Sequence, residues 1–231
     1  MTGRHAAAAS PAAVASPAAA ASPAMPPPEE ERGTARVPYV DPPTSGAPDP
    51  DGLRALYAEI AAARGSVLGL HRALAGAPGA LRAYFRLSHY IRDESSLDPR
   101  LRELAIVATG HALGVVYELA HHVPAARRAG LTEGQLAAVP RWRTDPAGAF
   151  GAVERAVLAY ADEVARTRTA APETLAALQD QLLPAQLIDL VLTVAFYHMV
   201  AAVVLPLGIE PETLSPAATA GRTRARRPSD T

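Results

Sequence analysis

The chain has 231 residues, a formal net charge of −1 and no cysteine. A net charge this close to zero gives no electrostatic argument for a nucleic acid or an anionic membrane as partner. The absence of cysteine excludes disulfides, a thiolate nucleophile and a thiolate metal site.

Both ends of the chain have compositions that do not favour a folded core. Residues 1–47 are rich in alanine, proline and serine, and residues 213–231 are polar and rich in arginine. Such segments bury too little apolar surface to offset chain entropy, so we expect disorder at both ends. A secretory signal would need an uninterrupted apolar stretch, and proline breaks the alanine runs. The sequence therefore predicts one folded domain over residues 48–212.

The first half of that domain shows helical spacing and no strand-like alternation. Helices are expected where a capping residue or a proline precedes apolar side chains spaced three and four positions apart. The expected caps are Asp51, Ser66 and Asp98, and Pro99 follows the last of them. The helices expected in this half cover residues 51–63, 66–75, 79–92, 101–113 and 115–129.

The second half continues in the same way. Its helices are expected to open at the capping box of Thr132 and Gln135, at Asp145 with Pro146, at Pro172 and at Pro184. Together the two halves predict an all-α domain of about eight helices.

Residues 190–207 are almost entirely apolar, at the lower length limit of a membrane-spanning helix. Asp189 stands at the start of this segment, His198 in its middle and Pro206 near its end. We therefore expect a helix at the centre of a folded core or of an oligomer, and no membrane as partner.

One stretch of twenty residues, 103–122, contains the side chains that could perform chemistry. Glu103, His111, Glu118 and His122 fall on one face at the helical spacing of about 100° per residue. The glycines in this stretch can also break it into two helices that meet. In either case Glu118 and His122 are four positions apart and can touch. A carboxylate beside an imidazole orients the ring and raises its basicity, so this pair indicates acid/base chemistry.

Each of these residues also has a purely structural interpretation. A Glu/His pair at this spacing is often a solvated feature of a helix surface, and Glu103 can pair with a neighbouring arginine. His111 can end a helix, and His198 can be a core histidine. His121 and His122 are adjacent, so we expect only one of them to face a site.

Four sequence elements occur in a definite order within the domain. They are RELAI at 102–106, YE-x3-H at 117–122, AGL at 129–131, and FY-x-MV followed by LGIEPE at 196–212. Over about residues 50–212 the chain resembles the carboxymuconolactone decarboxylase family, which includes the AhpD-like alkylhydroperoxidases. The resemblance implies an AhpD-like multi-helix fold whose protomers associate into dimers, trimers or hexamers.

The resemblance also separates two branches of that family. In the peroxidase branch, the positions of Val115 and Glu118 hold two cysteines, so we expect no thiol-dependent peroxidase activity. The decarboxylase-like branch reads close to E-Y-E-W-x-x-H over residues 116–122. This chain keeps the tyrosine, the second glutamate and the histidine, and it has Val116 and Leu119 at the other two positions.

These observations predict a cytoplasmic, cofactor-independent, decarboxylase-like enzyme that performs acid/base chemistry on a small carboxylate or lactone. The resemblance implies that His122 is the general acid or base, Glu118 its orienting partner and Glu103 a second relay group. The expected substrate contacts are Tyr117, His111 and His198. A metal site built from the same glutamates and histidines is one alternative. A catalytically inactive oligomeric member of the family is the other.

Overall fold

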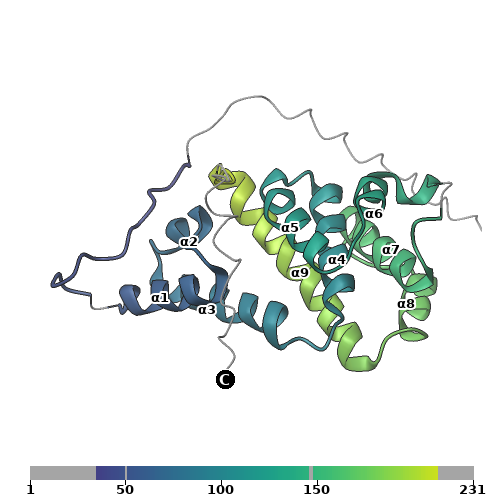
Figure 1. Ribbon diagram of the computed structural model, residues 1–231, viewed down its shortest axis with the longest axis horizontal. Coiled ribbons are helices and arrows are strands. Elements are labelled where there is room, and N and C mark those ends of the chain that lie inside the picture. Colours follow the sequence, from purple (N-terminus) through teal and green to yellow (C-terminus); the bar gives the residue numbers. More distant parts are fainter. Residues whose placement is uncertain (1–34, 50, 146–147, 213–231) are drawn as a thin grey trace, which may run out of the picture. The chain divides into compact units, whose positions relative to one another are not determined.

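The computed structural model describes residues 35–49, 51–145 and 148–212 (Figure 1). The chain divides into two units, Met1–Arg32 and Gly33–Thr231, and every described residue belongs to the second. The disorder predicted for residues 1–34 and 213–231 falls outside the described residues.

The described residues form nine α-helices and contain no strand. The α-helices are α1 (Leu53–Arg64), α2 (Gly69–Leu74), α3 (Pro78–His89), α4 (Pro99–Leu113), α5 (Val116–Arg128), α6 (Glu133–Ala138), α7 (Ala152–Thr167), α8 (Pro172–Gln179) and α9 (Pro184–Leu207). The π turn η1 (Tyr90–Glu94) continues α3, and the 3-10 segment η2 (Val139–Thr144) follows α6. The all-α fold predicted from the sequence is confirmed.

Helix α4 is at the centre of this domain. It packs against α5, α7 and α9, and Figure 1 shows the long α9 lying alongside it. Residues 103–110 of α4 are all buried. Apolar side chains of α4, α7 and α9 meet in the main core, among them Leu104, Leu158 and Leu190. A polar residue on this helix, such as Glu103, is therefore inside the protein and needs a partner there.

The predicted start of α4 is confirmed in detail. Asp98 accepts hydrogen bonds from the backbone N–H groups of Arg100, at 2.8 Å, and Leu101, at 3.3 Å. The predicted capping box of Thr132 and Gln135 is present at α6, and the two predicted prolines open α8 and α9. These local signals were readable because each cap satisfies backbone groups within its own helix.

The predicted caps of the first two helices are wrong. Asp49, rather than Asp51, accepts hydrogen bonds from the backbone N–H groups of Leu53 and Arg54, at 2.8 and 3.0 Å. Ser66 caps nothing, because α2 begins three residues further on. An acceptor just outside the helix can satisfy the same donors, so the capping position depends on the turn that precedes the helix.

Helix α7 begins later than predicted. Its first residue is Ala152, and Glu154 accepts the backbone N–H of Gly151 at 2.7 Å. Asp145 instead ends η2 and accepts the N–H of Ala149 at 3.0 Å. The proline predicted to follow it, Pro146, lies outside the described residues.

Residues 35–47 contact the helical domain although they form no helix. The backbone N–H of Arg36 donates to the carbonyl of Leu207 at 2.8 Å, and that of Val40 donates to the carbonyl of Arg72 at 3.0 Å. The folded part therefore begins before the predicted boundary at residue 48. Backbone hydrogen bonds attach this segment to the helices. Such bonds do not depend on side-chain type, so no apolar periodicity in the sequence indicates them.

Helix α9 is long and apolar enough to cross a membrane by length and composition alone. A single helix of this kind is weak evidence for a span, because the core helix of a soluble protein meets the same test. One face of α9, which includes Asp189, Thr193 and Tyr197, is buried in the domain. On the other side, Ile188 and Met199 are 64% and 41% exposed.

The contact between α4 and α5 depends on two glycines. Gly114 ends α4 with a φ of 68°, a left-handed conformation that glycine adopts without a steric penalty. At Gly110, an added Cβ would lie 3.1 Å from Leu119 Cδ2 and 3.3 Å from Glu118 Cβ. Both distances are shorter than an ordinary van der Waals contact, so Gly110 permits the close approach of α5 to α4.

Candidate active site

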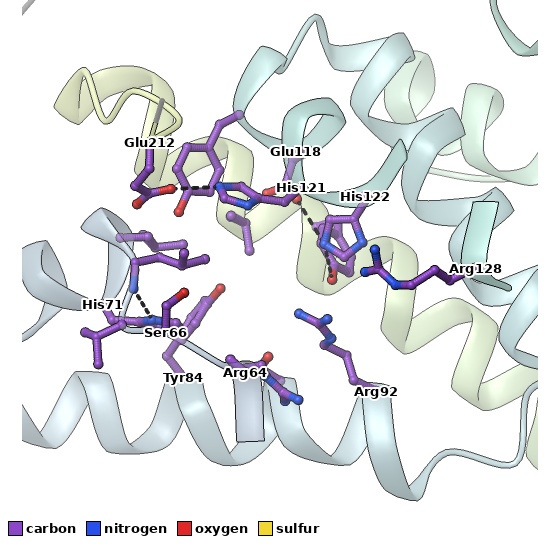
Figure 2. A pocket seen from close by; sticks show the side chains of 17 residues that line it. Arg64, Ser66, His71, Tyr84, Arg92, Glu118, His121, His122, Arg128 and Glu212 are labelled. Atoms are coloured by element: carbon purple, nitrogen blue, oxygen red, sulfur yellow. Dashed lines mark hydrogen bonds and ion pairs between the residues drawn. The ribbon is translucent and has the colours of Figure 1, made fainter. Parts of the chain in front are cut away.

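A cavity of about 380 Å³ lies between the N-terminal helices, α5 and α9 (Figure 2). Its polar lining includes three arginines, three histidines, three tyrosines and two glutamates. Apolar walls between them come from residues such as Leu70 and Val200. A hollow with this many titratable groups among apolar walls is suited to proton transfer on a small molecule.

Three side chains from three helices form a buried hydrogen-bonded chain beside this cavity. His122 Nδ1 lies 2.8 Å from Glu103 Oε2, and its Nε2 lies 3.0 Å from the Tyr197 hydroxyl. Because a carboxylate only accepts, Nδ1–H donates to Glu103 and the Tyr197 hydroxyl donates to Nε2. Glu103 therefore fixes both the ring orientation and the tautomer of His122.

Burial and charge set the protonation of this chain. Burial lowers the pKa of His122 more strongly than Glu103 raises it, so the ring is neutral at pH 7. Burial raises the pKa of Glu103, but the hydrogen bond from His122 and the charges of Arg92 and Arg102 lower it further than burial raises it, so this carboxyl stays ionised. Burial raises the pKa of Tyr197 well above its ordinary value.

Glu118 is in a different state from Glu103. It is 3% exposed, its Oε2 lies 3.8 Å from His122 Nε2, and its Oε1 is buried without a hydrogen-bond partner among the described residues. Burial raises its pKa to about 8, with Arg92 lowering it and Glu103 raising it. Glu118 therefore holds a proton at pH 7 and faces the cavity as a neutral carboxylic acid.

The structure brings together the three residues predicted to perform chemistry, Glu103, Glu118 and His122. The solvated interpretation of the Glu/His pair is wrong, because His122 is 5% exposed and Glu118 is buried as well. The pairing differs from the prediction in one respect. Glu103, which comes from the other helix, makes the close hydrogen bond that was expected from Glu118. A residue on α4 reaches the ring because Gly110 lets α5 come close.

The residues predicted to contact substrate are placed in different parts of the fold. Tyr117 lines the cavity. His111 does not line it, and instead borders a separate hollow of about 130 Å³ beside Trp142. His198 lies on α9 and is not part of the cavity wall either. The structure therefore does not bring His111 and His198 to the cavity with the glutamates and His122.

Both adjacent histidines of α5 line the cavity, whereas only one was expected to face it. His121 Nε2 lies 3.0 Å from Glu212 Oε2, and its ring lies 4.7 Å from that of Tyr117. Glu212 also accepts the backbone N–H of Gly69, at the start of α2. The segment that follows α9 thus joins α2 and α5 at one end of the cavity (Figure 2).

Two cavity residues that the sequence did not single out are Tyr197 and Arg92. Tyr197 is one position before His198 on a helix that is apolar on nearly every side, so the pattern did not indicate which face points inward. Arg92 lies in the π turn η1, where the wider turn rotates the chain relative to α3. Asp189 holds this turn on α9 by accepting from the Tyr90 hydroxyl and the Ser96 N–H, both at 2.7 Å.

The metal-site alternative has no geometric support in the described ranges. No three histidine, aspartate or glutamate side chains there lie close enough together to hold a metal ion.

Residues 78–163, from the start of α3 into α7, match the model of the carboxymuconolactone decarboxylase family. The resemblance to that family seen in the sequence is therefore confirmed over this part of the chain. A comparison with curated protein sequences gave no match.

Several solved structures share this fold. An uncharacterized peroxidase-related protein from Ralstonia eutropha JMP134, described as an alkylhydroperoxidase AhpD core, is 21% identical, with a TM-score of 0.63 over 78% of this chain and 93% of its own. One from Silicibacter sp. TM1040 is 18% identical, with a TM-score of 0.63 over 78% of this chain and 95% of its own. The debrominase Bmp8, solved with 2,3,4-tribromopyrrole, is 15% identical, with a TM-score of 0.61 over 79% and 98%. At these identities the similarity establishes the AhpD-like fold.

Proposed function

We propose that this protein is a cofactor-independent, decarboxylase-like enzyme that performs acid/base chemistry on a small carboxylate or lactone. The observation that supports this most directly is Glu118, a buried acid with one unpartnered oxygen beside the Glu103–His122–Tyr197 chain. A buried carboxyl without a partner is costly to the fold, and such groups are concentrated at functional sites.

In the proposed reaction the substrate carboxylate leaves as carbon dioxide, and its bonding electrons pass into a neighbouring carbonyl to form an enolate. Water-poor surroundings favour this loss. They destabilise the charged carboxylate relative to water but hardly affect the neutral carbon dioxide that it forms. Glu118 then donates its proton to the carbon that lost the carboxylate. The net change is the loss of carbon dioxide and the gain of one proton.

The remaining groups would return Glu118 to its acid form. The neutral ring of His122 has no proton on Nε2, so Nε2 would first take one from solvent water and then pass it to Glu118 Oε2, 3.8 Å away. While the imidazole carries that proton, the ionised Glu103 on Nδ1 stabilises the positive ring. Glu118 is thus the proton donor of this proposal, His122 its partner in proton transfer and Glu103 the group that orients the ring.

Thiol chemistry is absent from this proposal. The chain has no cysteine, and Val115 and Glu118 stand where the peroxidase branch has its two thiols. Clean protein should therefore not reduce an organic hydroperoxide at the expense of a dithiol.

The test is carbon dioxide release from a panel of carboxylated lactones and unsaturated carboxylic acids. Wild-type protein should release it, and Glu118→Gln should be slower by about 10²–10⁴-fold, the usual contribution of a positioned acid. The matched control is Glu59→Gln, at an exposed position on α1 outside this cavity. Equal release by wild type and Glu118→Gln would refute the assigned role. Release by none of the proteins would favour the inactive oligomeric alternative.

A further inference from the structure

The cavity wall contains three arginines to which the proposed proton transfer gives no role. Arg64, Arg92 and Arg128 all line it. Of the two glutamates in its wall, Glu212 is paired with His121, and Glu118 holds a proton at pH 7. Neither glutamate of the cavity wall therefore forms an ion pair with an arginine of the same wall.

Arg92 has no partner for its guanidinium within the described ranges. No acceptor there takes a hydrogen bond from it and no carboxylate there forms an ion pair with it, whereas Asp93 and Glu94 beside it pair with other residues. Figure 2 shows Arg92 extending from η1 across the cavity toward His122. Its charge lowers the pKa of groups on three other helices, Glu103, Glu118 and Tyr197. An unpaired guanidinium that acts on the whole cavity is available to a ligand.

Arg64 provides a second, independent observation. Its side chain is only 7% exposed, and Nη1 donates to Asp93 Oδ2 at 2.8 Å. Its other terminal nitrogen, Nη2, is buried and has no hydrogen-bond partner in the described part of the chain. A buried guanidinium with a free N–H group is costly unless an acceptor completes it.

We propose that Arg92 and Arg64 form a subsite that binds a carboxylate group of the ligand, on the side of the cavity across from α5. Guanidinium groups match the planar carboxylate and form short, charge-assisted hydrogen bonds with it. The choice of a carboxylate over another anion rests on the proposed function. The existence of an anion-binding subsite is inferred from the two arginines alone.

This subsite holds the substrate rather than activating it. A carboxylate bound by two guanidinium groups is stabilised as an anion. It is therefore not the carboxylate that leaves as carbon dioxide, and it remains on the product. Its binding fixes the distance between the reacting carbon and Glu118, as remote charged groups commonly do in enzymes. Arg92 and Arg64 are therefore positioning and specificity-determining residues of the site.

The test compares binding of carboxylates with binding of their uncharged amides. Acetate and acetamide, benzoate and benzamide, and succinate and succinamide are each titrated into the full-length protein at pH 7, by calorimetry and thermal shift. Inorganic phosphate is a further ligand. The variants are Arg92→Gln, Arg92→Lys and the control Arg86→Gln, whose exposed side chain on α3 lies outside this cavity and near Glu94.

At least one carboxylate should bind wild type about ten- to a hundredfold more tightly than its amide, and the preference should disappear in Arg92→Gln. Arg92→Lys should keep part of it, because lysine retains the charge and loses the planar fork. Arg86→Gln should behave as wild type. Arg92 is preferred for the test because Arg64 also pairs with Asp93, so its replacement can disturb the fold.

Three results would overturn the proposal. They are the absence of any carboxylate preference in wild type, a preference that survives in Arg92→Gln, and binding of phosphate without binding of any carboxylate. Failure of the proposed reaction gives a different result. In that case carboxylates bind through Arg92, but none of them loses carbon dioxide.

Discussion

Replacing Glu118 with glutamine should stabilise the protein at alkaline pH. Burial raises the pKa of Glu118 to about 8 in the folded protein, against an ordinary value of 4.5. Between these pH values the folded state holds a proton that the unfolded chain has lost. The free energy of unfolding contributed by this group therefore falls by about 1.4 kcal/mol per pH unit as the pH rises. The whole loss is on the order of 5 kcal/mol and is complete just above pH 8.

Glutamine has nearly the same shape and no charge, so the variant escapes this loss. Wild type and Glu118→Gln should have similar stability near pH 4.5, and the variant should melt about 10–20 °C higher near pH 8.5, at roughly 2–4 °C per kcal/mol for a chain of this size. Burial lowers the pKa of His122, which makes stability rise with pH below about 6.5 in both proteins. The difference between the two proteins therefore isolates Glu118.

The assay is the melting temperature of both proteins by calorimetry at unit steps from about pH 5 to pH 9. Glu59→Gln, at an exposed position, controls for the loss of a surface carboxylate and should shift stability by less than about 0.5 kcal/mol. A constant gap between Glu118→Gln and wild type across this range would show that Glu118 is ionised throughout. In that case the neutral acid that the proposed reaction needs would not exist.

Three further outcomes are expected. His122→Ala should lower turnover by about 10²–10⁴-fold in a steady-state assay while His111→Ala, outside the cavity, leaves it near wild type; comparable losses in both would contradict the site. Deleting residues 1–34 should leave the melting temperature unchanged, whereas deleting 1–45 should lower it by several degrees, because only the longer deletion removes the hydrogen bonds of Arg36 and Val40 to the helical domain. The chain should self-associate through the exposed apolar side of α9, so Met199→Arg should reduce the mass found by light scattering, and a wild-type monomer at micromolar concentration would refute this.

The sequence predicted those features that depend on short-range chemistry. A cap such as Asp98 or the box of Thr132 and Gln135 acts within four residues, so its signal is local. The nearness of Glu118 and His122 follows from helical spacing in the same way. The family resemblance added Glu103, whose hydrogen bond to His122 crosses between two helices.

Features that depend on packing between helices were not predictable in the same way. The sequence could not choose between Tyr197 and His198 because α9 has no polar face to fix its rotation in the core. Arg92 reaches the cavity because a π turn interrupts the helical register, and such a turn has no reliable sequence signature. Whether Glu103 or Glu118 makes the close hydrogen bond to His122 depends on how closely α4 and α5 approach, and no single helix determines that distance.

That distance gives Gly110 an importance out of proportion to its size. It does not itself line the cavity, yet the absence of its side chain lets Leu119 and Glu118 of α5 pack closely against α4. Even the smallest substitution, alanine, would require Leu119 and Glu118 to shift by a few tenths of an ångström, and a shift of Glu118 changes how it meets His122. A library of all single substitutions can be selected for folding and, separately, for activity. At position 110, alanine should be tolerated in the selection for folding and rejected in the selection for activity.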